Sequence, residues 1–426
     1  MKKFTFSMLA AGMLLVCPYL GAQSFTVKQV MIGSGGNYAN PDDFVELSSY
    51  DPVSDQSVNF GTVFTQSVQD VMISDGFLYV AAQDSIAKYD ANTYERLAIT
   101  AASGVNKLDL YEGRLLATFA YPVTENFVRE FDASDLTFLG YIADVSDESA
   151  GMLIIGNRLY VAVPGGWTSI TGKMAMIDLD SFELIDEVDL GSEAMGIYNL
   201  YLANNQIVTV NRSAWGTTTG NLTTINTDLS QFTHYTYAES IGAGIGVYDN
   251  LLYTQMNNGI GSVNLETMEL EKSTVVEPFA MSIAAAKLDT VNGLFYITIT
   301  DYSALGAGFI YNLAGEEQNT FDAGISAEAI AIDYRSSVGV QEFHTQIALQ
   351  AYPNPTQDVC RISLPDELAG AQWKICDLQG RIYLEGNTDL NRKTLNLDLE
   401  GLQNGMYIIT LRNNQAQGMA KVVLKP

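Results

Sequence analysis

Aromatic side chains in short, polar, glycine-rich stretches are the residues of this sequence best suited to contact a ligand. Trp167 lies in Pro-Gly-Gly-Trp-Thr-Ser and Trp215 in Ser-Ala-Trp-Gly-Thr-Thr. Tyr38, Tyr121 and Tyr302 occupy comparable polar stretches. Indole and phenol rings combine a large apolar contact area with one polar group, which suits sugar and peptide ligands. The alternative, in which each ring packs against its own loop, remains open.

The other reactive side chains are too few for the familiar catalytic and metal centres. The sequence has 2 histidines, His234 in its main part and His344 further on. A Ser-His-Asp triad or a multi-histidine zinc site therefore lacks its residues. Asp178 and Asp180 lack the rest of a calcium-binding loop. We predict no catalytic residues, no metal and no cofactor.

Charge divides the chain into two parts. The formal net charge is −27, yet residues 346–426 hold 8 basic and 8 acidic residues, so the excess lies in the preceding part. Such a step predicts two separately solvated domains. An acidic body repels phosphates, which excludes nucleic acid as a partner. Solubility outside the cell is a sufficient reason for the acidity.

The N-terminus has the pattern of a secretory signal peptide. Two lysines open the sequence, an apolar run follows over 4–16, and Leu-Gly-Ala precedes Gln23. This pattern predicts cleavage after residue 22, and the run is too short to span a membrane. A lipid anchor at Cys17 is the alternative, which the bulky Val16 before it disfavours. No second long apolar run follows, so we predict no transmembrane segment.

Two kinds of residue recur along the body at a period of about 40–48 residues. The first is an apolar residue early in a strand that follows a polar or glycine turn: Leu78, Leu115, Leu159, Ile207, Leu252 and Phe295. The second is an Asp or Asn that ends a later strand, where its side chain can bond its own backbone in a turn: Asp51, Asp90, Asp132, Asp178, Asn226, Asn264 and Asn312.

This period, with four short strands per unit, predicts an all-β fold, a seven-bladed β-propeller. The segment 325–334 has the pattern of an innermost strand without a blade of its own. Joined to residues 25–65 it would complete one blade from both chain ends, which would remove the open sheet edges. A solenoid and an eight-bladed ring are the rival folds.

The propeller interpretation positions the aromatics. Connections between the second and third strands of each blade share a face with the mouth of the central channel, and the long ones carry the five aromatic residues. Asn199 at the channel is a further candidate ligand contact. The innermost strands bring polar residues to the mouth, where they could bind a ligand or hydrogen-bond water: Gln69, Asp70, Asn106, Lys107, Tyr198, Asn199 and Glu328.

Three short phrases of the body share one pattern: Gly-Phe-Leu-Tyr-Val at 76–80, Arg-Leu-Tyr-Val at 158–161 and Ala-Lys-Tyr-Asp-Ala-Asn-Thr at 87–93. By these phrases the body resembles secreted YVTN/YncE-like propeller surface proteins of bacteria. The residues of the phrases are structural, so the resemblance implies a fold and no catalytic assignment.

The C-terminal part runs from a Tyr-Pro-Asn-Pro motif through Asp-x-x-Gly-Arg and Leu-x-x-Gly-x-Tyr to an apolar end flanked by lysines. In this order of motifs it resembles the type A sorting domain of type IX secretion. The matching residues are Tyr352, Pro353, Asn354, Pro355, Asp377, Gly380, Leu402, Gly405, Tyr407, Lys421 and Lys425. The resemblance implies the type IX secretion machinery as a partner.

The residues of this part also indicate a small β-sandwich by themselves. Cys360, Ile362 and Leu364 alternate with polar neighbours, as half-buried strands do. Cys360 and Cys376 are the cysteines left after signal cleavage, and whether they pair remains open. We predict a signal peptide over 1–22, a propeller over 23–335, a linker over 336–351 and a sorting domain over 352–426.

The sequence therefore predicts a secreted or surface-displayed propeller that acts as a binding or scaffold module, with a glycan or peptide as possible ligand. A propeller hydrolase or lactonase is the enzyme alternative. A purely structural surface-layer or adhesion component is the third interpretation. The ligand, surface anchoring and oligomeric state are not decided by these patterns.

Overall fold

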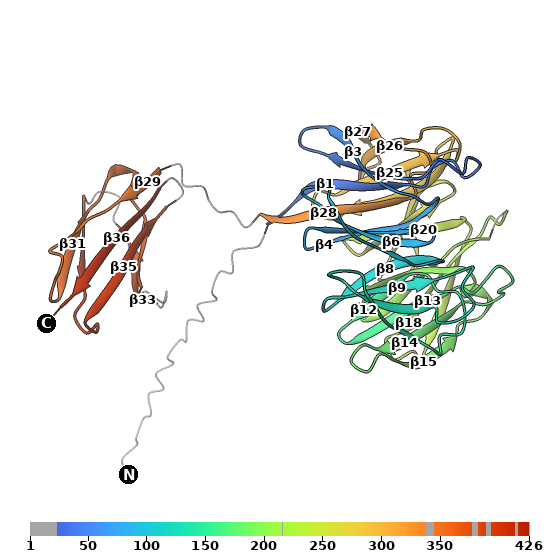
Figure 1. Cartoon of the computed structure of the whole chain (residues 1–426), viewed down its shortest axis with the longest axis horizontal. Helices are drawn as coiled ribbons and strands as arrows, with labels where there is room; N and C mark the ends of the chain where they lie inside the picture. The colour runs from blue at the N-terminus through green and yellow to red at the C-terminus, as the bar shows by residue number, and fades with distance from the viewer. Residues whose placement is uncertain are drawn as a thin grey trace, which may run out of the picture. The chain divides into compact units, whose positions relative to one another are not determined.

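The protein is described from a computed structural model (Figure 1). The described residues are 24–214, 216–337, 345–376, 382–388, 393–413 and 416–425. The signal peptide predicted over 1–22 lies outside them. Contacts divide the chain into two compact units, a body of Phe25–Ser336 and a second unit that contains Ser337–Pro426, here called the tail unit.

The described part of the body folds into seven four-stranded sheets, here numbered 1 to 7 along the chain. Sheets 2 to 7 are antiparallel and take their strands in chain order. Sheet 1 has the order β28 (Ala329–Ser337), β1 (Ser24–Ser34), β2 (Val45–Asp51), β3 (Gln56–Val63). Sheet 2 has β4 (Val68–Ser74), β5 (Phe77–Ala82), β6 (Ser85–Asp90) and β7 (Arg96–Ala101). Sheet 3 has β8 (Val105–Tyr111), β9 (Arg114–Phe119), β10 (Val128–Asp132) and β11 (Phe138–Ile142).

The remaining four sheets repeat this arrangement. Sheet 4 has β12 (Met152–Ile155), β13 (Arg158–Val163), β14 (Lys173–Asp178) and β15 (Glu183–Asp189). Sheet 5 has β16 (Ile197–Ala203), β17 (Gln206–Asn211), β18 (Gly220–Asn226) and β19 (Phe232–Tyr237), after the short 3₁₀ helix η1 (Ser192–Ala194). Sheet 6 has β20 (Ile241–Tyr248), β21 (Leu251–Met256), β22 (Gly259–Asn264) and β23 (Leu270–Val276). Sheet 7 has β24 (Ser282–Asp289), β25 (Leu294–Thr300), β26 (Ala307–Asn312) and β27 (Glu317–Asp322).

The predicted Asp and Asn residues end the third strand of all seven sheets. At Asp90 the carboxylate accepts hydrogen bonds from the backbone N–H of Asn92 at 2.7 Å and of Thr93 at 2.9 Å. These bonds satisfy turn donors locally, which confirms the reason expected for the residue type. Asn226 differs. Its side-chain carbonyl accepts a hydrogen bond from the Gln206 side-chain amide. The Asp228 carboxylate instead accepts the turn hydrogen bond, from the Ser230 N–H.

The predicted apolar residues lie in the second strand of their sheets and are buried. Both faces of these strands are covered. In β5, Leu78 and Val80 belong to the core shared with sheet 1, whereas Tyr79 and Ala81 belong to the core shared with sheet 3. Burial on both faces explains why these strands appear as continuous apolar runs in the sequence.

A hydrophobic cluster joins each sheet to the next one along the chain. Another cluster joins sheet 7 to sheet 1, with Tyr296 and Phe321 on one side and Tyr50 and Ile330 on the other. Strand β28, from the end of the body, pairs with β1 from its beginning, and Figure 1 shows these two strands side by side. The two ends of the body therefore share one sheet.

The described residues of the tail unit form two sheets around one core. The five-stranded sheet has the order β29 (Thr345–Ala348), β36 (Ala416–Leu424), β35 (Gly405–Arg412), β32 (Gln372–Cys376), β33 (Ile382–Asn387). The three-stranded sheet has the order β30 (Ala351–Tyr352), β31 (Val359–Ser363), β34 (Thr394–Asp398), and η2 (Asp366–Leu368) is a short 3₁₀ helix. The predicted alternation is confirmed in β31, where Cys360 and Ile362 point into the core.

The linker predicted over 336–351 is too long at its C-terminal end. Strand β29 lies within it and pairs in parallel with β36. Ile347 packs against the tail core and Leu349 is part of it, which holds this segment in the sheet. Cys360 and Cys376 are both free thiols.

Candidate functional site

The aromatics expected to contact a ligand lie on connections with equivalent places in their sheets. Each connection joins the second strand to the third: β1–β2 for Tyr38, β9–β10 for Tyr121, β13–β14 for Trp167 and β25–β26 for Tyr302. Strand direction alternates within an antiparallel sheet, so equivalent connections leave equivalent strand ends. Trp215, between β17 and β18, lies outside the described residues.

The rings on these connections reach solvent. The Trp167 side chain is 102% exposed, Tyr121 82%, Tyr38 72% and Tyr302 50%. The Trp167 indole therefore does not pack against its own loop. Large exposed aromatic surface is available for a ligand at this residue, whereas the role of all five rings in binding stays a prediction.

The structure brings two of the aromatic connections into contact. The Asn37 side-chain amide, next to Tyr38, donates a hydrogen bond to the backbone carbonyl of Ser303, next to Tyr302, at 3.4 Å. Burial raises the pKa of the Tyr302 phenol, and the nearby Glu328 carboxylate raises it further. Tyr302 therefore lies beside the residue that precedes β28, on the connection that touches the Tyr38 loop.

The polar residues predicted at the channel mouth bond to one another and to backbone. The Lys107 ammonium lies 3.6 Å from the Asp70 carboxylate and donates to the Gln69 carbonyl at 2.5 Å. The Tyr198 hydroxyl donates to the Asn106 side-chain carbonyl at 3.4 Å. These groups come from the first strands of sheets 2, 3 and 5. Their contacts therefore connect strands that are far apart in the sequence.

Asn199 also links two sheets. Its side-chain carbonyl accepts a hydrogen bond from the backbone N–H of Gly244, in β20, at 2.8 Å. A side chain added at Gly244 would collide with the ring of Tyr201. The position of Asn199 is thus explained by packing of β16 on β20, and its contact with a ligand stays a prediction.

Arg212 is a charged residue at this site that the sequence patterns did not point to. Its guanidinium carbon lies 3.2 Å from the centroid of the Tyr198 ring, while the Lys107 ammonium lies 5.5 Å from it. Burial alone would raise the pKa of Tyr198, but the two positive charges outweigh burial and hold the pKa below its ordinary value. Arg212 follows β17 in the same polar connection as Trp215, which is the one signal that could have suggested it.

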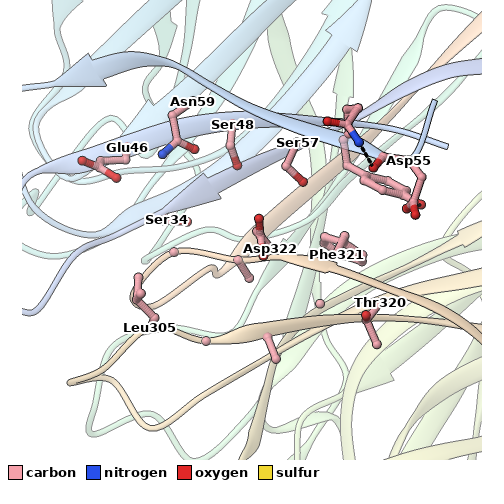
Figure 2. A pocket seen from close by; sticks show the side chains of 17 residues that line it. Ser34, Glu46, Ser48, Asp55, Ser57, Asn59, Leu305, Thr320, Phe321 and Asp322 are labelled. Carbon is pink, nitrogen blue, oxygen red and sulfur yellow. Dashed lines mark hydrogen bonds between the residues drawn. The ribbon is translucent and has the colours of Figure 1, made fainter. Parts of the chain in front are cut away.

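A groove of about 860 Å³ lies between sheet 1 and sheet 7. Figure 2 shows Ser48 and Ser57 from one wall and Asp322 from the other pointing into it. It was not predicted, because its two walls lie far apart in the sequence. Its lining residues are Ser34, Glu46, Ser48, Tyr50, Asp55, Gln56, Ser57, Asn59, Leu305, Gly306, Ala307, Gly308, Thr320, Phe321, Asp322, Ala323 and Gly324.

Small residues on sheet 7 leave this space open. Ala307 and Gly308 begin β26 along one wall, directly after Gly306. The ring of Phe321 lies against Gly308 so closely that a β-carbon there would be 2.3 Å from it. The same ring stacks on Tyr50 of sheet 1, with centroids 5.2 Å apart. The two rings therefore pack the sheets together beside a strip of glycine and alanine.

Asp55 closes one end of the groove. Its carboxylate accepts hydrogen bonds from the Tyr50 hydroxyl at 3.0 Å and from the Asn319 side-chain amide at 2.8 Å. Burial, together with the Asp55 charge, raises the pKa of Tyr50 to about 12. This bridge joins β27 to the β2–β3 hairpin across the groove.

Within the described residues, no group of three or more His, Cys, Asp or Glu side chains is arranged to hold a metal ion. Among the same residues no helix has the length and apolar character to cross a membrane.

The Tyr-Pro-Asn-Pro part of the sorting motif lies against β36. The Asn354 side-chain amide donates to the Lys421 carbonyl at 2.8 Å, and its carbonyl accepts from the Val423 N–H at 2.9 Å. The asparagine thus fastens the motif to β36. Tyr352 is exposed, and Pro353, Pro355 and Lys425 line a hollow of about 350 Å³.

The second half of the motif is structural. Tyr407 is buried and its hydroxyl donates to the Gln403 carbonyl at 2.7 Å. Leu402 packs against the tail core and Gly405 begins β35. Asp377 and Gly380 lie outside the described residues.

Sequence comparison identifies the tail unit. The profile of the family described as "Secretion system C-terminal sorting domain" matches residues 350–425. The protein is therefore secreted or displayed at the cell surface, and its tail indicates export by type IX secretion. A search of curated proteins finds no match.

Comparison with solved structures identifies the fold of the body as propeller-like. One similar structure is PorZ, described as an essential bacterial surface component of the type IX secretion system of Porphyromonas gingivalis, at 14% identity and a TM-score of 0.50 over 95% of this chain and 59% of PorZ. Another is the extracellular domain of the provisionally assigned one-component system BT4673 of B. thetaiotaomicron, at 12% identity and a TM-score of 0.50 over 95% of this chain and 57% of that one. The chain thus spans less than two thirds of either.

A third similar structure is a provisionally named 6-phosphogluconolactonase of Bacteroides uniformis, at 10% identity and a TM-score of 0.54 over 72% of this chain and 100% of that one. At these identities the likeness extends to the fold alone.

Proposed function

We propose that the protein is a seven-bladed β-propeller, closed by both ends of the body, that binds a glycan or peptide outside the cell through its long connections between second and third strands. Export uses a type A sorting domain of the type IX route. The observation that carries the binding function is the full exposure of the Trp167 indole on its connection.

Ring closure is supported by the contents of sheet 1. It takes its first strand from residues 329–337 and its other three from residues 24–63. The hydrophobic cluster between sheets 7 and 1 continues the series between consecutive sheets. A closed ring removes the open faces that a linear stack of sheets would expose at both ends.

The binding face is supported by the equivalent placement of four exposed aromatic residues. Single exposed apolar residues are ordinary on protein surfaces, so the support lies in the recurrence of aromatic residues on equivalent connections and not in exposure alone. Tryptophan and tyrosine are also the residues that most often dominate binding energy at interfaces. In the groove and at the channel mouth the described aromatics are instead engaged in packing.

Substitution of Trp167 tests this function. On an array of glycans and peptides the full chain should give a defined set of ligands, and Trp167→Ala should weaken the strongest by on the order of 1–2 kcal/mol. The melting temperature should stay unchanged, because the indole has no packing partners. Tyr141→Ala is the matched control, since Tyr141 is exposed on the outer strand of sheet 3 away from these connections.

The other two interpretations predict different results. Turnover of lactone or ester substrates without array ligands would favour the enzyme. Absence of both ligands and turnover would favour a purely structural surface component. Retained binding with lost stability in Trp167→Ala would place the site elsewhere.

The tail is proposed to act as a separable export signal. A chain ending after residue 342 should keep the melting temperature of the body and fail to cross the outer membrane of the native host. Fractionation of cells and medium by immunoblot measures this. Normal export of the shortened chain would contradict the role of the tail.

A further inference from the structure

The groove between sheets 1 and 7 has the properties of a second binding site, independent of the exposed aromatics. Its volume of about 860 Å³ falls in the range of about 300–1,000 Å³ that is usual for small-ligand sites. Its polar groups, and not its size alone, indicate what it would bind.

Two largely buried serine residues of the lining have hydroxyls without a hydrogen-bond partner in the described part of the chain. Ser34 is 4% exposed and Ser48 is 8% exposed. Neither hydroxyl makes a hydrogen bond to any residue that the structure describes, and both residues line the groove. Among the described residues, the fully buried side-chain oxygens without a partner belong to Tyr89, Thr254 and Ser262. The Ser34 and Ser48 hydroxyls are therefore accessible from the groove and free to bond a molecule that occupies it.

The charges of the lining are all negative. Glu46, Asp55 and Asp322 line the groove, and its 17 residues include no Lys, Arg or His (Figure 2). Asp55 is engaged by Tyr50 and Asn319. Glu46 and Asp322 have no ion-pair or hydrogen-bond partner among the described residues. The groove thus presents unpaired acceptors and two unpaired negative charges.

The polar groups of this wall follow the strand direction. Glu46, Ser48 and Tyr50 alternate along β2 and face sheet 7, because Val45 before them and Leu47 among them belong to the core with sheet 2. At a rise of about 3.3 Å per residue, Glu46 and Tyr50 are about 13 Å apart. The groove is therefore long enough for an extended ligand lying parallel to β2.

We propose that this groove binds an extended cationic ligand that carries two or more protonated amines or guanidinium groups. Its N–H donors would pair with the Glu46 and Asp322 carboxylates and with the Ser34 and Ser48 hydroxyls. Charge-assisted hydrogen bonds of this kind are roughly twice as strong as neutral ones. The same chemistry is offered by a free polyamine and by the side chains of a basic peptide.

Titration calorimetry on the full chain at physiological salt tests the proposal. The two probes are spermidine and a lysine-alanine-lysine peptide with blocked ends, which separate a free polyamine from a peptide as the source. At least one probe should bind with a stoichiometry of one. The double variant Glu46→Gln/Asp322→Asn should weaken that binding at least tenfold.

The matched control is Glu183→Gln/Asp186→Asn on β15, which removes the same two charge types from an exposed strand of sheet 4. It should change the affinity less than twofold. Equal weakening in both double variants would show that probe binding depends only on the overall net charge of −27. That result would overturn the site. Failure of both probes to bind, or displacement by a neutral oligosaccharide instead, would also overturn it.

A second variant blocks the groove without changing charge. Thr320 is exposed on β27 at its edge, so Thr320→Trp should fill the space, leave the melting temperature unchanged and abolish probe binding. Trp167→Ala should leave probe binding intact. Failure of the proposed function at the aromatics would therefore be distinguishable from failure of this site.

Discussion

Equivalent positions in sheets 1 and 2 have opposite character. In β6 of sheet 2, Ala87 and Tyr89 precede the strand-ending Asp90 by three and one residues, and both are buried in the apolar core toward sheet 1. In β2 of sheet 1, Ser48 and Tyr50 precede Asp51 by the same intervals and face sheet 7. The first interface is closed by packed side chains, while the second contains the groove.

The partner residues across each interface explain the difference. Tyr89 packs against Phe60 and against Gly61, where a β-carbon would lie 3.1 Å from its ring. Tyr50 packs on Phe321, but the neighbouring positions on sheet 7 are glycine and alanine. Two features decide whether the interface is sealed. One is the residue at a single strand position, alanine in sheet 2 and serine in sheet 1. The other is the size of the side chains opposite it. The groove is therefore specified by sequence and is not a general feature of neighbouring sheets.

Removing β28 should have the largest effect, because it acts on both interfaces at once. Ala329 and Ala331 belong to the core between sheets 1 and 2, and Ile330 and Ile332 to that between sheets 7 and 1. A body ending after Gly324 would expose both cores and the edge of β1. We expect aggregation in size-exclusion chromatography. A monomer with the native melting temperature would contradict this expectation.

Exchanging alanine and serine between the two interfaces should lower the free energy of unfolding less than removal of β28 does. The two substitutions should differ in their cost. Ala87→Ser buries a hydroxyl in the closed interface and should cost about 1–3 kcal/mol of unfolding free energy. Ser48→Ala removes a hydroxyl that has no partner and should cost less than about 0.5 kcal/mol.

Urea denaturation of the two variants beside the unmodified chain measures both values. Similar costs for the two substitutions would mean that Ser48 is as well packed as Ala87. In that case the comparison between the interfaces fails.

The sequence patterns predicted the repeating part of the fold well. Each Asp or Asn that ends a third strand was predicted, because a turn needs a local hydrogen-bond acceptor and these residues recur at a nearly regular interval. The all-β class was predicted from the alternation of apolar and polar residues. The sorting domain was predicted from the order of its motifs, which few other sequences share. The extra strand β29 was missed because four residues are too few for a clear alternation.

The candidate sites were predicted less completely. Trp167 was identified because a tryptophan among small polar residues has little to pack against. The groove was missed, because its walls around Ser48 and Gly308 are some 260 residues apart in the chain. Hydrophobic periodicity shows which face of a strand is buried and not which residues lie opposite. The contact of Arg212 with Tyr198 was missed for the same reason.

The smallest expected effect concerns the pH dependence of the groove interface. The pKa of Tyr50 is raised from 10.0 to about 12 by burial and by Asp55. Because the folded-state pKa exceeds the unfolded one, the contribution of the neutral phenol is complete below about pH 10 and is lost as the pH rises through about 12. Loss of the proton removes the donor to Asp55 and sets two negative charges side by side.

Tyr50→Phe should therefore flatten the loss of unfolding free energy between pH 10 and 12, although it removes one hydrogen bond at neutral pH. The measurement is urea denaturation at a series of pH values for the unmodified chain and the variant. Tyr38→Phe, on an exposed connection, is the control and should follow the unmodified chain. Parallel curves for Tyr50→Phe and the unmodified chain would show that the hydrogen bond from Tyr50 to Asp55 does not contribute to stability at the end of the groove.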